Sequence, residues 1–278
     1  MTLKRIIPSI LLILIYLSGH TQDSISFAMT YLPMHKYELN IDQQLKSTTT
    51  FSGSDSVLDV LKKRGITNPT VVNKAISGTS ITTTGAYNNN MTMPVQLIFK
   101  DVEDGDGNTL IPEGAGLMGT VQKGKMPEFD SIVLPDENDQ DMKNALMQLK
   151  GIIQQIHLPS AKMKAGDDYI YNTPVNIPIS GTTMNATISI TYKLISVTDS
   201  LANFDLTMIT NFHIDSALVK NATGEGNGTG KLIYDRINTF PIQEKLDYNM
   251  RMTTGDGKKS VKVEIASHSS HNYVITKL

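Results

Sequence analysis

The sequence predicts a mainly β protein of the α+β class. In this fold a curved antiparallel sheet, or half-barrel, of two pseudo-repeats wraps around one long amphipathic helix. Apolar and polar residues alternate with a period of two over several segments, as in strands with one buried face. Residues 138–157 instead carry apolar residues at three- and four-residue steps, which is typical of an amphipathic helix. Two glycine-led segments, 114–127 and 228–241, end on proline at the same offset and indicate the repeat.

Residues 1–22 have the pattern of a secretory signal peptide. Lys4 and Arg5 precede an apolar run from Ile6 to Leu17, which is shorter than the roughly 20 residues that span a bilayer. The chain has 0 Cys, so it lacks both disulfides and the lipid-acceptor cysteine of a lipoprotein. We therefore expect a periplasmic or secreted bacterial protein with no transmembrane helix after signal cleavage. An uncleaved N-terminal anchor is the alternative.

The composition predicts a packed globular chain. Of the 278 residues 40% are hydrophobic and 19% are charged, which favours a core over disorder. The formal net charge of -2 leaves no basic excess to bind a phosphate backbone, so we expect no nucleic-acid partner. We expect one domain over 23–278, with β halves at about 30–135 and 160–278 joined by the helix 138–157.

The alternating segments are the predicted strands. They are residues 37–41, 91–99, 184–194, 204–214, 242–252, 261–265 and 273–275. In one of them Ile188 and Ile190 lie on one side, and Thr187 and Ser189 lie on the other. The glycine-rich stretch at 221–230 is predicted to be a turn between strands.

Two helical segments interrupt the strands. A helical insertion is expected at about 54–76, because Ser54 suits an N-cap and Gly65 a helix end, and Asn68 with Pro69 suits the start of a second short helix. The longer helix 138–157 has one broad apolar stripe, which we expect to lie against the concave face of the sheet.

Two stretches carry a family resemblance. Residues 158–171, "LPSAKMKAGDDYIY", hold a Leu-Pro pair followed by a Gly-Asp-aromatic stretch, and residues 228–252 run from a glycine-led strand into an alternating strand rich in Met and Tyr. In both, the chain resembles an uncharacterised family of secreted bacterial β-proteins, a domain of unknown function. The resemblance implies the curved sheet around a helix of the lipoprotein-carrier class, and no known activity. The family's tryptophan after Gly-Asp is replaced near that place by Tyr169.

The acidic stretch "DVEDGDGNTLIP" at 101–112 is either a calcium loop or a turn. Asp104, Asp106 and Asn108 match the first three ligand positions of an EF-hand. Thr109 stands where that loop needs Gly, and Ala115 stands where it needs Glu. The hairpin turn is therefore the favoured interpretation, and these three residues are the candidates for a cation. No cofactor is expected.

Catalytic motifs are missing from the sequence. There is no thiol, no G-x-S-x-G elbow and no H-E-x-x-H helix, and the glycine-rich 224–231 lacks two required residues of a P-loop. We therefore expect a protein that is not an enzyme. An exported hydrolase is the least favoured alternative.

The remaining candidate is an apolar cleft between sheet and helix. The chain has 14 Met, a side chain that adapts to irregular apolar partners, so the favoured function is binding of a hydrophobic or lipid-like ligand. The predicted lining is Met184, Ile188, Ile190, Met208, Met250, Leu149 and Ile153. The alternatives are that these side chains only fill the core, and that the protein is a structural or adhesive module of the cell envelope acting through its Thr- and Asn-rich strand faces.

Overall fold

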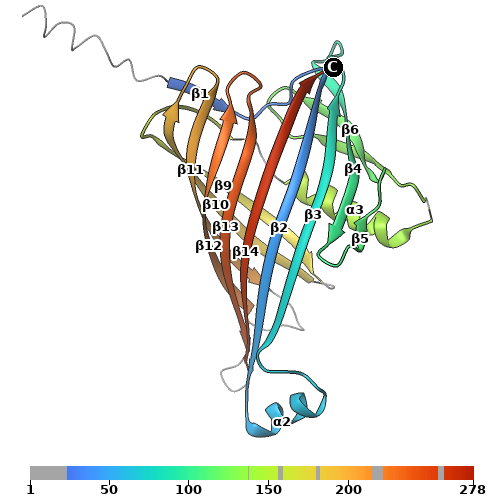
Figure 1. The fold of residues 1–278 in the computed structure, drawn as a ribbon, viewed down its shortest axis with the longest axis vertical. Helices are drawn as coiled ribbons and strands as arrows, with labels where there is room; N and C mark the ends of the chain where they lie inside the picture. Colours follow the sequence, from blue (N-terminus) through green and yellow to red (C-terminus); the bar gives the residue numbers. More distant parts are fainter. Residues whose placement is uncertain (1–23, 137, 156–158, 180–181, 215–221, 256–259) are drawn as a thin grey trace, which may run out of the picture.

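The computed structural model describes residues 24–136, 138–155, 159–179, 182–214, 222–255 and 260–278. It confirms a mainly β protein. The described chain forms one 12-stranded antiparallel sheet, one 2-stranded sheet and two helices (Figure 1). The predicted signal peptide lies outside the described residues.

The large sheet is a continuous series of antiparallel strands. The order is β7-β6-β4-β3-β2-β14-β13-β12-β11-β10-β9, and the short β5 pairs with β4. The bounds are β2 (His35–Ser52), β3 (Thr70–Thr84), β4 (Thr92–Asp104), β5 (Thr109–Ile111), β6 (Gly116–Gln122), β7 (Glu128–Val133), β9 (Asp168–Ile179), β10 (Thr182–Val197), β11 (Leu201–Ile214), β12 (Ala222–Asp235), β13 (Phe240–Gly255) and β14 (Ser260–Lys277). β2 and β14 have 18 residues each, which corresponds to about 60 Å.

One strand, β12, contradicts the predicted turn at 221–230. Two of its glycines, Gly224 and Gly226, face aromatic rings of the two neighbouring strands. A Cβ on Gly224 would lie 1.9 Å from Phe212 Cζ, and a Cβ on Gly226 would lie 2.0 Å from the Tyr248 hydroxyl. These glycines therefore make room for rings inside a sheet, where the local sequence alone indicates a turn.

The helical insertion is shorter than predicted. The helix α2 (Asp55–Lys63) begins after Ser54, and Gly65 at φ 75° follows its end. Residues from Thr70 onward belong to β3 and pair with β2, because their β-branched side chains favour a strand. Asn68 does not cap a helix.

One face of the sheet, the inner face, collects the buried side chains. Directly paired residues lie on the same face. One such row runs through Leu194, Phe204, Leu232, Glu244, His271, Ile41 and Gly78. Because the register continues from β10 to β3, the apolar clusters at the two sides of the sheet share this inner face.

The first cluster is covered by the two-stranded sheet of β1 (Ser24–Ala28) and β8 (Ser160–Lys164). Phe27 of β1 is completely buried. Its ring centroid lies 5.1 Å from that of Tyr192, 4.6 Å from that of Phe204 and 5.3 Å from that of Tyr234. The small sheet therefore caps the inner face of β10 to β12 at one end.

The second cluster involves the helix α3 (Gln140–Ile153) and corrects the predicted fold class. Leu146 is the buried residue of this helix, and it packs on β4, β6 and β7. The 14 residues of α3 span about 21 Å, far less than the long strands. The prediction of a half-barrel wrapped on a long amphipathic helix is therefore wrong: the sheet is not closed, and the short α3 contacts its edge strands β7 and β9 and does not extend along the concave face. The predicted helix end at 156–157 lies outside the described residues.

The end of α3 lies between the two edge strands of the sheet, β7 and β9. Gln154 Nε2 donates to the Phe129 carbonyl of β7 at 3.2 Å. The Gln155 side chain donates to the Asn176 carbonyl of β9 at 3.3 Å and accepts from the Asn176 N–H at 2.7 Å. Edge strands carry unpaired backbone groups, so these two glutamines satisfy part of each edge.

We expect Leu146→Ala to lower the free energy of unfolding by about 2–5 kcal/mol, because it removes a buried leucine from the second cluster. The matched control is Met147→Ala, since Met147 is 54% exposed; it should change stability by less than about 0.5 kcal/mol. Denaturant unfolding measures both. Similar values for the two variants would contradict the packing of α3.

Candidate ligand-binding site

The inner face of β13 remains partly uncovered beyond the two clusters. Leu246, Tyr248, Met250 and Met252 are half-buried there, and they alternate with exposed residues. The exposed set is Lys245, Asp247, Asn249, Arg251 and Thr253. β13 therefore has an apolar inner side and a polar outer side.

Four of the predicted ligand residues share this inner face. Ile190 pairs with Met208, and Ile188 lies two residues from Ile190 on the same side of β10. Met250 pairs with Gly226, which lies beside Gly228, the partner of Met208. All four side chains are half-buried. Met184 pairs with Ile214 through its backbone, but its side chain lies outside the described residues.

The two predicted helix residues lie elsewhere. Leu149 and Ile153 pack against the second cluster on β4, β6 and β7. A crevice of about 270 Å³ between α3 and β9 is lined by other helix residues, such as Met147 and Ile152. The structure therefore does not bring Leu149 and Ile153 together with the strand residues.

The glycines of β12 let large side chains of the neighbouring strands lie over the inner face. Gly226 and Gly228 pair with Met250 and Tyr248 on one side, and both glycines are buried. The Tyr248 side chain lies over Gly226, and the Phe212 ring lies over Gly224. The Met, Tyr and Phe side chains of β11 and β13 therefore form one apolar surface across β12, called the apolar inner surface.

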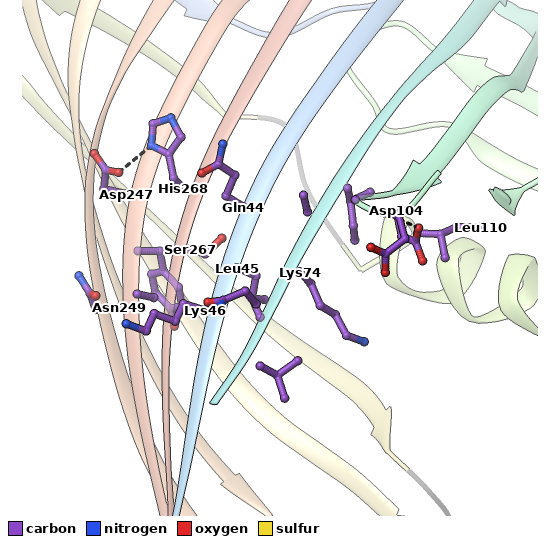
Figure 2. Close-up of a pocket in the computed structure, with 18 residues that line it drawn as sticks. Gln44, Leu45, Lys46, Lys74, Asp104, Leu110, Asp247, Asn249, Ser267 and His268 are labelled. Atoms are coloured by element: carbon purple, nitrogen blue, oxygen red, sulfur yellow. Dashed lines mark hydrogen bonds and ion pairs between the residues drawn. The ribbon is translucent and has the colours of Figure 1, made fainter. Parts of the chain in front are cut away.

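A hollow of about 970 Å³ lies over β13, β14, β2 and β3. Its lining includes the inner-face row Tyr248, Ser267, Leu45 and Lys74, which are successive cross-strand partners. It also includes residues of the outer parity, such as Asn249 and Gln44. Figure 2 shows Asp104 and Leu110, from the β4 and β5 hairpin, on one side of it. The hydrogen-bonded pair Asp247 and His268 lies on the opposite side (Figure 2), with 2.7 Å between Oδ1 and Nδ1.

The inner face also carries an ionisable pair. Glu244 Oε1 lies 3.8 Å from His271 Nδ1, and both side chains are 32% exposed. Burial raises the pKa of the Glu244 carboxyl, and the nearby His271 opposes this rise. Burial also raises the pKa of the Tyr192 and Tyr273 phenols, and the charge of Glu244 raises both further. A polar spot thus borders the apolar inner surface.

Sequence reasoning missed this pair, although a signal was present. Glu244 stands on the apolar side of the alternation, between Ile242 and Leu246. A carboxylate at such a position indicates either an irregular strand or a buried charge. His271 could not be assigned as its neighbour, because the pairing of β13 with β14 is not visible in the sequence.

The acidic stretch forms the predicted hairpin turn. Asp104 Oδ1 accepts hydrogen bonds from the Asp106 N–H at 3.0 Å and the Asn108 N–H at 2.9 Å, and the Asn108 side-chain amide donates to both carboxylate oxygens. The side chain and then the backbone of Asn108 lower the pKa of Asp104. Within the described chain, no three His, Asp or Glu side chains gather closely enough to hold a metal ion. In this geometry Asp104 organises a turn.

Comparisons with known proteins give little similarity. No protein-family model and no curated protein matches the chain. Among solved structures, a mutant of the Rh. blastica porin is 7% identical with a TM-score of 0.28, covering 86% of this chain and 100% of that chain. A structure described as "Asymmetric conductivity of engineered proteins" is 8% identical with a TM-score of 0.27 and the same two coverages, 86% and 100%. Both TM-scores are too low to support a conclusion about this chain.

The described helices give one further finding. None of them is both long enough and apolar enough to cross a lipid bilayer.

We expect Glu244→Gln to stabilise the protein at neutral pH. A raised pKa means that the folded state holds the proton more tightly than the unfolded chain. The free energy of unfolding therefore falls as the pH rises from the unfolded pKa through the folded pKa of Glu244. Glutamine does not ionise, so the variant should lack this fall. Melting temperatures between about pH 4 and about pH 8 test this; a variant that melts below the wild type at the upper end would contradict it.

Proposed function

We propose that this chain is an exported, non-catalytic protein that binds a hydrophobic, lipid-like ligand along the inner face of β11 to β13. The observation that carries the proposal is the half-buried apolar side of β13, with polar residues at every alternate position. Among the described residues, neither the two-stranded sheet nor α3 makes extensive contact with β13. A contiguous apolar face that is left partly exposed favours a binding surface.

The length of the apolar inner surface suits an extended chain-like ligand. From Leu246 to Met252 the strand covers about 20 Å, and these alternate side chains are half-buried along the whole length. Met208, Met250 and Met252 belong to this surface, and methionine adapts to varied apolar partners. The adjacent hollow of about 970 Å³ matches the usual size of small-molecule sites.

The ionisable pair favours an amphiphile over a pure hydrocarbon. Glu244 precedes Leu246 on the same side of β13, so the polar spot lies at one end of the apolar inner surface. An acyl chain lying along this surface would bring its head group to Glu244 and His271. The ligand then gains hydrogen bonds at one end and apolar contact along the rest.

The alternative is a structural or adhesive module that acts through its outer face. Thr207, Asn211, Asn227 and Asn249 are exposed there on neighbouring strands. A protein isolated from its own host with no lipid, but with a partner recovered by crosslinking to this face, would support the alternative and contradict ligand binding.

Binding of a fluorescent fatty acid to the purified full chain tests the proposal. We expect Met250→Asp to weaken it about tenfold or more, because a charge on the inner face must lose water when an acyl chain covers it. The matched control is Asn227→Asp, which adds the same charge on the outer face of β12, next to the Gly226 that pairs with Met250, and should leave the affinity unchanged. Native mass spectrometry of protein purified from its own host should show bound lipid.

Two results would overturn the proposal. One is equal binding by the two variants, which would remove the inner face from the site. The other is the absence of both co-purified lipid and measurable fatty-acid binding in the wild type, with thermal unfolding showing that the chain is folded.

A further inference from the structure

The connection between β2 and β3 projects from the far end of the sheet. This connection, residues 53–69, is the tip segment. It holds α2 and lies beyond the ends of the longest strands (Figure 1). Its base is fastened by Asn68, whose side chain accepts from the Phe51 N–H at 3.0 Å and donates to the Phe51 carbonyl at 2.8 Å. The tip segment is thus held at the sheet but extends away from it.

The helix α2 has a well-formed end but little to pack against. The Gly65 N–H donates to the Lys62 carbonyl at 3.0 Å and the Ile66 N–H to the Leu61 carbonyl at 3.0 Å, which is a Schellman motif. Among the described residues, no other helix or strand makes extensive contact with α2. A helix of 9 residues without such packing is marginal in water. A surface that covers its apolar side would stabilise it.

Apolar side chains at the tip face solvent. Leu61 and Ile66 line a shallow hollow of about 520 Å³. Val60 is 48% exposed and Ile66 is 38% exposed. Val71 and Val72, at the start of β3, are also exposed. The tip therefore presents a small apolar area that no described part of the chain covers.

Three consecutive cations border this area. Lys62, Lys63 and Arg64 are exposed, and none of them forms an ion pair with a described residue. The chain as a whole carries a net charge of -2, so this run is a local positive site on a slightly acidic protein. Apolar side chains beside Lys and Arg are the pattern of an interfacial helix.

We infer that the tip segment docks on an anionic lipid surface. Val60, Leu61 and Ile66 would enter the boundary between head groups and acyl chains, while the three cations contact lipid phosphates. The tip is a projection and not a groove, and its few apolar side chains suit shallow insertion better than the large buried area of a stable protein interface. The inference stands on the tip alone and does not require the ligand site.

Sedimentation of the full chain with lipid vesicles tests this. Vesicles of phosphatidylcholine mixed with phosphatidylglycerol should bind the chain, whereas vesicles of phosphatidylcholine alone should bind it weakly. Each basic side chain near an anionic membrane raises the partition coefficient about fivefold. The triple variant Lys62→Gln, Lys63→Gln, Arg64→Gln should therefore lower it by about 100-fold.

A matched control has the same change in net charge at the opposite end of the sheet. The exposed lysines Lys123, Lys125 and Lys277 are suitable. They lie at that end because Gln122 pairs with the start of β4 and Lys277 pairs with the start of β2. Replacing these three lysines by glutamine should leave vesicle binding nearly unchanged. An equal loss in the control would overturn the inference, since it would show attraction by net charge only.

Two more variants test the apolar and acidic parts of the tip. Val60→Ser together with Ile66→Ser should reduce binding even with the cations present. Asp55→Asn together with Asp59→Asn should strengthen it several-fold, because two anions near the surface are removed. Unchanged binding in both pairs, or no binding of the wild type to anionic vesicles, would refute membrane docking and leave a protein partner as the occupant of the tip.

Vesicle docking by the tip segment can be measured independently of ligand binding on the inner face. Met250→Asp should still bind anionic vesicles, and the triple tip variant should still bind the fluorescent fatty acid in vesicle-free solution. Thermal unfolding of the triple variant should match the wild type, because its three side chains make no described ion pair.

Discussion

The continuous antiparallel pairing of the large sheet determines which face each strand side chain occupies. From β9 to β7 each strand pairs with the next, and directly paired residues share a face, with local bulges such as the one after Leu194. A further slip of one residue in any pair would turn an apolar side outward for all the strands beyond it. The covered clusters under Phe27 and Leu146, the open apolar side of β13 and the Glu244–His271 pair all follow from this single arrangement.

The sequence predicts the strands well, but it does not predict which helix or strand packs on each part of the sheet. Alternation located most strands, because a half-buried strand shows its two sides locally. It could not show that α3 is too short to fill the sheet, since its apolar stripe looks the same whether one residue or seven are buried. It also failed at Gly224 and Gly226, whose strand conformation depends on rings from Phe212 and Tyr248 that are distant in the chain.

The candidate site was predictable to the same extent. Ile190, Met208 and Met250 could be chosen because each lies on the apolar side of its own strand, and register then brings them to one face. Leu149 and Ile153 were assigned with them on the assumption of a central helix, which the structure does not have. The covering of the β12 glycines by rings of β11 and β13, and the polar spot beside them, depend on cross-strand neighbours, which no single segment encodes.

The pairing of β2 with β14 makes the continuity of the sheet depend on contacts between segments that are far apart in the chain. These strands hold residues 35–52 and 260–277 and pair along their full length. Until β14 pairs with it, β2 presents one of the longest edges in the molecule to any other extended segment, and such edges promote aggregation. Contacts across so much sequence also form slowly. The slowest contact of the fold is therefore also the one that protects its longest strand from pairing with another molecule.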